Sequence, residues 1–294
     1  HLTEHIDGID RLRMLVDPFS PTATAGSTRI DATTVERLAH EFAAAPSAVC
    51  YGRMGLSTQR HGALCQWLIQ SINLLTGNLD RAGGAMFTTP AADILEPSSP
   101  GSLGRWRSRV RELPEFHGEL PVAPLAEDLL EPGEDRPRAM LTVAGNPVLS
   151  TPDGRRLDAA LERLDFMVSV DFYRNEAARH AHLILPPTSP LAREHYDLVF
   201  NVLAVRDVAR WSDPLYDKPA DAKHDWEIFH ELLVRLDPKP PLRRRLERAA
   251  RRRLGPRGMT ALLLRLGPYG PRRRRRFGDK KLLTLRKLRA ARHG

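Results

Sequence analysis

"AMLTVAGNPVLSTPDGRRLDAALERLDFMVSVD" (residues 139–171) carries the pattern that decides the fold. The stretch opens with an apolar run over 139–144 and closes with another over 166–170, and each run has the length of a buried strand. Between them, leucines and alanines recur every three or four residues, which predicts an amphipathic helix with Asp153 or Thr151 as its N-cap. Two such strands joined by a helix favour a parallel sheet.

A third strand is predicted over 181–185, after a short helix over 175–179, so the strand–helix unit repeats. In an open parallel sheet, ligands bind beyond the carboxyl ends of the strands. The residues that follow the predicted strands are Gly145, Asn146 and Pro147, then Asp171, then Pro186. We therefore expect all of them to lie at one edge of the sheet.

This edge suits a nucleotide diphosphate. Gly145 lets the backbone approach a diphosphate, and the N-terminus of the following helix offers unpaired N–H groups and a partial positive charge. The carboxylate of Asp171 is able to accept hydrogen bonds from ribose hydroxyls or from the N–H groups of guanine. The residues alone leave an alternative open, because Gly-Asn-Pro is a common turn and an Asp after a strand is a common helix cap.

The first 90 residues predict a second α/β lobe. Residues 1–30 contain proline and glycine breaks and are expected to be irregular, whereas 31–45 is predicted to be a helix. A short strand is predicted over 47–51, and a helix over 58–75 is apolar nearly all round, which is typical of a helix inside a large protein. That helix stops at two closely spaced turn signals, Thr76-Gly77-Asn78 and Gly83-Gly84.

The remaining segments have weaker patterns. Residues 91–136 are rich in proline and acids and are predicted to be a surface excursion. Residues 137–240 are expected to form the α/β region with the parallel sheet, which continues into a small β-rich extension over 191–210 and a helix over 225–236. Residues 241–294 are predicted to be a basic linker or tail.

The net charge of +9 is unevenly distributed. Residues 241–294 contain 20 of the 45 lysines and arginines but only Glu247 and Asp279 among the 36 acids, so this part carries +18 and the rest −9. Such a tail attracts phosphates, which leaves a nucleic-acid-binding or partner-binding module without redox activity as an alternative function. One Tyr and one Phe in the tail serve base stacking poorly, so nucleic acid is not the expected partner.

Several functional classes find no support in the residues. The chain has no apolar stretch of about 18 residues, so no transmembrane segment is predicted. Cys50 and Cys65 are not spaced as CxxC, and we expect plain thiols of a cytoplasmic, reducing compartment. Motifs of serine hydrolases, zinc proteases and P-loop enzymes are absent, and no catalytic residue or metal ligand is assigned.

Three blocks together resemble the molybdopterin oxidoreductase family: "YGRMGLSTQRHG", "INLLTGNLDRAGGAMF" and "LTVAGNPVLSTPDGRRLDAALERLDFMVSVDFYRNEAARHAHLILPPTSPLAREHYDL". The resemblance runs from about residue 1 to 236. It implies a two-electron oxidoreductase acting on a small substrate, similar to formate dehydrogenases and nitrate reductases. The implied cofactor is bis(molybdopterin guanine dinucleotide) with molybdenum or tungsten.

The resemblance also assigns residues. Thr76, Gly77, Asn78, Gly83 and Gly84 match the segment that passes near the pterin, where paired glycines allow close approach to a bulky planar group. The matches at the guanine dinucleotide are Gly145, Asn146, Pro147, Asp171, Asn175, Glu176 and Pro186. Arg53 and Gln59 lie in a glycine-rich block near the cofactor, and Arg53 suits a phosphate.

The chain also departs from the family pattern. Ala177, His182 and Ala192 stand where the family often has Thr, Asp and an acid. The four clustered cysteines of the family's [4Fe-4S] domain are not in this chain. We therefore expect the middle of a longer enzyme, inactive alone, whose partners are the N- and C-terminal domains of the same protein and an electron carrier that the sequence does not identify.

Overall fold

The computed structural model describes residues 6–94, 101–270 and 282–291. The chain divides into two compact units, His1–Thr88 and Thr89–Gly294, which are treated separately below. The arginine run at 272–276, part of the predicted basic tail, lies outside the described residues. Among the described helices, none is long and apolar enough to cross a membrane.

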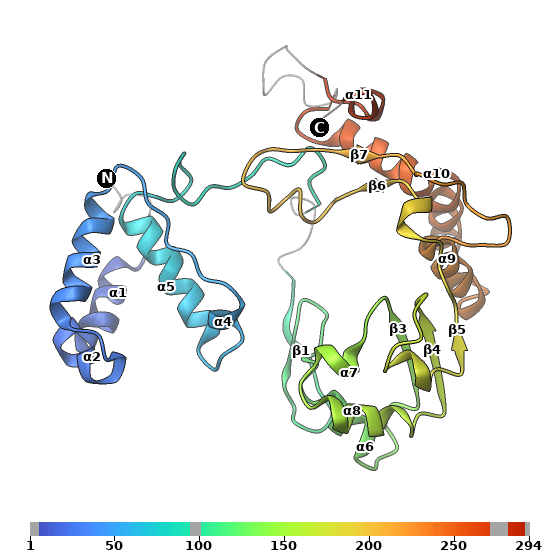
Figure 1. The fold of residues 1–294 in the computed structure, drawn as a ribbon, viewed down its shortest axis with the longest axis horizontal. Coiled ribbons are helices and arrows are strands. Elements are labelled where there is room, and N and C mark those ends of the chain that lie inside the picture. Colours follow the sequence, from blue (N-terminus) through green and yellow to red (C-terminus); the bar gives the residue numbers. More distant parts are fainter. Residues whose placement is uncertain (1–5, 95–100, 271–281, 292–294) are drawn as a thin grey trace. The chain divides into compact units, whose positions relative to one another are not determined.

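The first unit is helical (Figure 1). Its elements are α1 (Ile9–Val16), a 3-10 turn (Asp17–Phe19), α2 (Pro21–Thr28), α3 (Ala32–Ala44), α4 (Met54–Ser57) and α5 (Gly62–Leu75). The expectation of irregular structure over 1–30 is wrong from Ile9 onward, where α1 begins. Pro21 does not break the chain as expected, because it is the first residue of α2, which Ser20 caps. The helix predicted over 31–45 is confirmed as α3.

The strand predicted over 47–51 does not form. This segment pairs with the side chain of Asn73 in α5 instead of with another strand. The Asn73 side chain accepts from Cys50 N at 2.8 Å and donates to Cys50 O at 2.9 Å, as a neighbouring strand would. Within residues 6–88 the β-structure is limited to a single bridge, Leu79 to Ala85, so the predicted second α/β lobe is wrong and this lobe is helical.

The second unit contains the predicted parallel sheet. Strands β3 (Ala139–Val143), β4 (Phe166–Val170) and β5 (Leu183–Ile184) form a sheet in the order β3-β4-β5, and both pairings are parallel. The chain crosses from β3 to β4 through α7 (Pro147–Ser150) and α8 (Gly154–Leu161), and Asp153 caps α8 as predicted.

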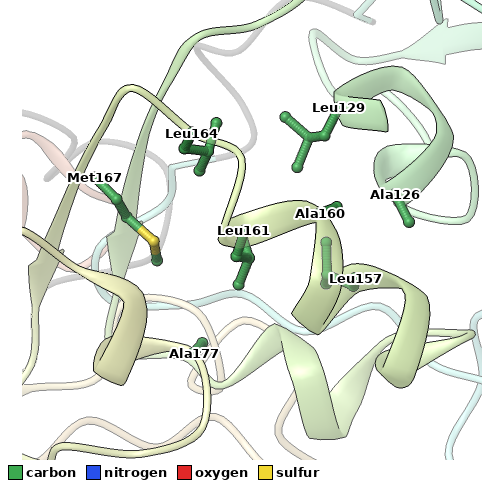
Figure 2. Close-up of a cluster of buried hydrophobic side chains, with 8 residues drawn as sticks. All are labelled: Ala126, Leu129, Leu157, Ala160, Leu161, Leu164, Met167 and Ala177. Atoms are coloured by element: carbon green, nitrogen blue, oxygen red, sulfur yellow. The ribbon is translucent and has the colours of Figure 1, made fainter. Parts of the chain in front are cut away.

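One face of this sheet is packed, and the other is exposed over much of its area, with Val170 buried on it. Leu157, Ala160 and Leu161 of α8 form the main core with neighbours from 126 to 177, as Figure 2 shows. The opposite face exposes apolar side chains, although a parallel sheet is usually covered on both faces. These side chains are Leu141, Val143, Phe166 and Leu183.

The surface excursion predicted over 91–136 is also wrong in part. This segment contains a hairpin of β1 (Leu103–Arg107) and β2 (Pro114–Phe116), followed by α6 (Leu125–Leu130). Helix α6 buries Ala126 and Leu129 in the main core. Its six residues are too few for a helical period to stand out in the sequence.

The C-terminal elements follow the sheet, and all of them except α9 contribute to a second hydrophobic cluster. They are β6 (His195–Tyr196), β7 (Trp211–Ser212), α9 (Asp225–Leu236), α10 (Leu242–Leu266) and α11 (Leu285–Ala290). The helix predicted over 225–236 is confirmed as α9, whereas the β-rich extension amounts to two short strands. Leu264 and Leu288 are buried with Trp211, so the predicted basic linker or tail is in part a folded piece of this unit.

Candidate functional site

The carboxyl ends of the three parallel strands meet at one edge of the sheet. Gly145, Asp171 and Pro186 each follow the end of a strand, and the register pairs Val143 with Val170. The prediction that these residues lie at the same edge is therefore confirmed. The edge is formed by backbone turns and polar side chains.

Asn146 links the turn after β3 to the loop after β4. Its side-chain nitrogen donates to Glu176 Oε2 at 2.6 Å, and its side-chain oxygen accepts from Ala177 N at 3.3 Å. Hydrogen bonds from its own backbone N–H and from Asn146 lower the pKa of Glu176 below its usual value, helped by the charge of Arg179. Glu176 is exposed and ionised at neutral pH, with acceptor capacity left over.

Asp171 organises the loop that follows β4. Only 7% of this residue is exposed. One carboxylate oxygen accepts from Tyr173 N at 2.9 Å, and the other accepts from Asn175 Nδ2 at 3.1 Å. Asn175 in turn accepts from Ala178 N at 2.9 Å. Each oxygen of Asp171 retains a second lone pair, because a carboxylate oxygen accepts two hydrogen bonds.

The same loop is fixed to α8 by Asp158. The Asp158 carboxylate contacts His180 Nε2 at 2.6 Å and Arg179 Nη2 at 2.5 Å. Hydrogen bonds from His180 and then from Arg179 lower the pKa of Asp158, despite some opposing desolvation. Two charge-assisted contacts therefore hold the segment that carries Asn175 and Glu176 against a packed helix.

Three exposed side chains at this edge were not selected from the sequence. The rings of Phe172 and Tyr173 lie 4.7 Å apart at 61°, and both are largely exposed. Arg174 is exposed and forms no ion pair with the part of the chain that the structure describes. The signal was present, since two aromatic residues and a cation directly follow a buried strand and its terminal acid.

The helix N-terminus that was expected to hold a diphosphate is not as predicted. The helix that directly follows the Gly145 turn, α7, has only four residues and begins with Pro147, which lacks an N–H. The longer helix α8 is already capped, because Asp153 accepts from Arg156 N at 3.4 Å. Neither α7 nor α8 therefore offers the long, uncapped helix N-terminus that was expected at this edge.

Pro186 lies beside a pocket of about 690 Å³ that extends from the end of β5 to the loop before α9. Thr188 is buried in its wall, with its hydroxyl 2.6 Å from His224 Nδ1. His182, which stands where the family often has Asp, does not reach the carboxyl edge. Its Nδ1 accepts from Met167 N near the start of β4 at 3.1 Å.

The second group of predicted site residues lies in the first unit, in the turn after α5. Asn78 is buried, and its side chain accepts from Ala48 N at 3.3 Å and donates to Thr76 Oγ1 at 3.0 Å. Gly77 and Gly83 have φ of 70° and 84°, a backbone region that favours glycine. A Cβ on Gly84 would lie 2.2 Å from the carbonyl oxygen of Asn78.

These contacts within the chain explain why glycine occupies positions 83 and 84. The turn packs against its own backbone and against residues 46–48, so close approach to a planar cofactor is not needed to explain them. Arg53 and Gln59 are both exposed. Gln59 Nε2 lies 3.4 Å from Cys65 Sγ, and the Arg53 guanidinium has no partner among the described residues.

The described residues contain no group of three or more His, Cys, Asp or Glu side chains placed to hold a metal ion. Cys50 and Cys65 are free, partly buried thiols. The candidate site argued below is the sheet edge in the second unit, and the cofactor role of the turn at 76–84 in the first unit stays a prediction.

Comparison with known proteins adds the family. The profile of a family described as molybdopterin oxidoreductase matches residues 31–235. The chain is 25% identical over 242 residues to the catalytic subunit of assimilatory nitrate reductase from Bacillus subtilis, covering 77% of this chain and 33% of that protein. It is 24% identical over 255 residues to a nitrate reductase from Synechocystis, covering 80% and 35%.

A trimethylamine-N-oxide reductase from Haemophilus influenzae is 22% identical over 229 residues, which cover 70% of this chain and 27% of that protein. The chain thus spans about a third of the length of the curated relatives it matches.

Proposed function

The chain belongs to the molybdopterin oxidoreductase family, and on that premise we propose that its sheet edge binds the guanine end of a molybdopterin guanine dinucleotide. The observation that carries the proposal is the network of Asn146, Asp171, Asn175 and Glu176 beyond the carboxyl ends of β3 and β4. Ligands of open parallel sheets bind at this position.

The groups at the edge fit a guanine nucleotide. Guanine presents N–H donors, and Glu176 is an exposed carboxylate held in place by Asn146. The exposed ring of Tyr173 offers a planar surface to a base. Arg174 supplies a cation for a phosphate in place of the missing helix dipole.

The roles of the buried and exposed groups differ. Asp171 and Asn175 shape the loop, since both form hydrogen bonds to its backbone or to each other. Glu176 remains free to accept from the base. A Cβ at Gly145 would meet a single atom, Val143 O, at an ordinary contact distance of 3.5 Å, so this side of the turn is not tightly packed by the chain itself.

The cofactor itself supplies the redox chemistry when bound, through a molybdenum or tungsten centre that exchanges two electrons with a small substrate. The residues of this chain bind and orient its nucleotide end. The metal ligand, an iron–sulfur cluster and the second half of the cofactor cleft belong, in this proposal, to other parts of the same enzyme.

Two observations support a place within a larger enzyme. The relatives are about three times as long as the matched part. One face of the parallel sheet exposes Leu141, Val143, Phe166 and Leu183, whereas parallel sheets are normally covered on both faces. We propose that further polypeptide covers this face and that the 294-residue chain is inactive by itself.

The test is the nucleotide content of the protein that contains this chain, purified from a host that makes molybdopterin cofactors. Acid treatment releases the nucleotide, which is separated by chromatography, and metal is measured on the same sample. We expect GMP in a fixed ratio to molybdenum or tungsten. Release of another nucleotide, or of none from metal-containing protein, would reject the guanine dinucleotide.

A further inference from the structure

Helix α10 consists of two unlike halves. Gly255 breaks the helix with φ 58° and ψ −176°, and Pro256 follows it. Beyond this break, Thr260 and Leu264 are buried against the C-terminal cluster. Before the break, every residue from 242 to 254 is exposed except Arg248. We call residues 242–254 the basic half-helix.

Among the described hydrogen bonds and ion pairs, the one that ties the basic half-helix to the body is made by Arg248. Its guanidinium donates to the Asp237 carbonyl oxygen at 2.7 Å and to Asp237 Oδ2 at 2.5 Å. A further ion pair, Arg243 with Glu247, lies within the helix. Apart from the side that carries Arg248, most of the surface of the half-helix is therefore available to a partner.

The basic half-helix is amphipathic. Seven of its 13 residues are arginine, and Glu247 is its one acid. At 100° per residue, one stripe contains Arg244, Arg245, Arg248, Arg251 and Arg252. The other stripe contains Leu242, Leu246, Ala249, Ala250 and Leu254, with Arg253 among them and Arg243 beside them. Leu242 and Leu246 are 71% and 62% exposed.

Both stripes are unfavourable in water. Arg244, Arg248 and Arg252 follow each other at i, i+4 spacing, where like charges repel, and of these three only Arg248 has an acidic partner among the described residues. The exposed leucines gain free energy only if they leave water. An anionic partner with an apolar layer relieves both costs, and the headgroup region of an anionic bilayer has this composition. Arginine side chains reach the phosphates while their stems lie along apolar surface.

Nucleic acid would pair with the arginine stripe of the half-helix but would not cover its apolar stripe. Its phosphates pair with arginine, but they offer nothing to Leu242 and Leu246. The half-helix also lacks aromatic side chains for base stacking. We propose that the basic half-helix lies on the surface of anionic lipid bilayers and holds the protein there. This inference goes beyond the proposed cofactor role and does not depend on it.

The experiment is co-sedimentation of the full chain with vesicles of phosphatidylcholine, with and without phosphatidylglycerol. We expect binding only to the anionic vesicles, and its loss between about 0.1 M and about 0.5 M salt as charges are screened. Replacing Arg244, Arg245, Arg251 and Arg252 with Gln leaves the Arg248–Asp237 contact intact. It should weaken binding at least about thirtyfold.

Three further variants make the result specific. Lysine at the same four positions preserves charge and should bind within about threefold of the parent. Glutamine at Arg11, Arg29, Arg206 and Arg210 removes the same charge elsewhere and should leave binding unchanged. Leu242→Gln with Leu246→Gln should weaken vesicle binding about tenfold without changing binding to duplex DNA. Residues 271–281, which contain the arginine run at 272–276, have the parent sequence in every variant, so they do not account for differences in binding.

The proposal fails if anionic vesicles do not bind the chain at low salt. It also fails if the control arginine set weakens binding as much as the α10 set, because the half-helix would then have no special role. The proposal is also rejected if the leucine variant binds vesicles as well as the parent does and the chain binds DNA as tightly as vesicles. The half-helix would then bind any polyanion through its charge alone. Circular dichroism confirms that each variant is folded.

Discussion

The turn at 76–84 and the sheet edge at 145–176 contain similar residues, glycine and asparagine beside a strand or helix end, yet they use them differently. In the turn, Asn78 is buried and bonds to the backbone of its own unit, as does Asn73 near the end of α5. At the sheet edge, buried Asp171 shapes a loop whose neighbours Tyr173, Arg174 and Glu176 remain exposed. Inside its own unit the turn is thus explained by contacts within the chain, whereas the sheet edge presents exposed side chains, and the cofactor roles of both stay predictions.

This comparison makes a prediction for each region. Substitutions in the turn should change the stability of the chain, whereas exposed positions of the sheet edge should change ligand content. Asp171 lies between these cases, because it is buried and also adjacent to the proposed ligand.

The largest expected effect is that of Asn73→Ala. The change removes both hydrogen bonds to Cys50 and leaves its backbone N–H and C=O unpaired in a partly buried place. We expect the free energy of unfolding to fall by about 2–4 kcal/mol, measured by urea denaturation. Gln70→Ala, an exposed position on the same helix, should change it by less than about 0.5 kcal/mol. Equal effects at both positions would show that the Asn73 contacts contribute little.

The next effect concerns the paired glycines. In Gly84→Ala the new Cβ would lie 2.2 Å from Asn78 O, which is backbone and not free to move. We expect a loss of about 1–3 kcal/mol. Gly26 in α2 has no atom within 4 Å of such a Cβ, so Gly26→Ala should stabilise by about 0.5–1 kcal/mol. Thermal melting of both variants tests the contrast, and an unchanged melting temperature for Gly84→Ala would refute the packing explanation.

Asp171→Ala is expected to lower both stability and cofactor content. Loss of the contacts to Tyr173 and Asn175 should cost about 1–2 kcal/mol. Cofactor occupancy under limiting supply should fall about tenfold to a hundredfold, because the loop beside the nucleotide loses its shape. Turnover per bound metal should change little. Full metal content with a lowered melting temperature would reduce Asp171 to a structural role.

The smallest expected effect is a pH dependence from Asp158. Its folded-state pKa is lowered by His180 and Arg179, so its contribution to stability is fully present above the unfolded-state pKa of about 3.9. The contribution is lost as pH falls through the lower, folded-state pKa. Unfolding of wild type and Asp158→Asn at pH 7 and at about pH 3 should show a smaller difference between the two proteins in acid. A constant difference would argue against this ion pair.

Sequence reasoning found the sheet and missed much of what surrounds it. The strands at 139–143 and 166–170 and the helix between them follow from local periodicity, which the sequence displays directly. The contact of Asn146 with Glu176 joins residues 30 apart, and only the folded chain brings them together. Asp171 stands out in the sequence for its position after a strand, but its burial and partners depend on the loop geometry.

The errors have specific physical causes. The segment 47–51 has the composition of a strand, but the side chain of Asn73 supplies the partner that a strand would. The sequence signal for this contact was Asn73, an amide side chain within an otherwise apolar helix. The C-terminal residues have the composition of a linker because arginine dominates them, whereas the apolar run "ALLLRL" at 261–266 contains Leu264, which anchors α10 in the fold.

The central claim is that the carboxyl edge of the sheet binds a guanine nucleotide, and the exposed pair Arg174→Gln with Glu176→Gln tests it most directly. The matched control is Arg138→Gln with Asp165→Asn, an exposed ion pair beside the opposite ends of β3 and β4. GMP and metal are measured in each protein after production under limiting cofactor. We predict a fall of about tenfold in GMP content for the first pair, with an unchanged melting temperature and no loss for the control. Equal GMP content in both would contradict the account.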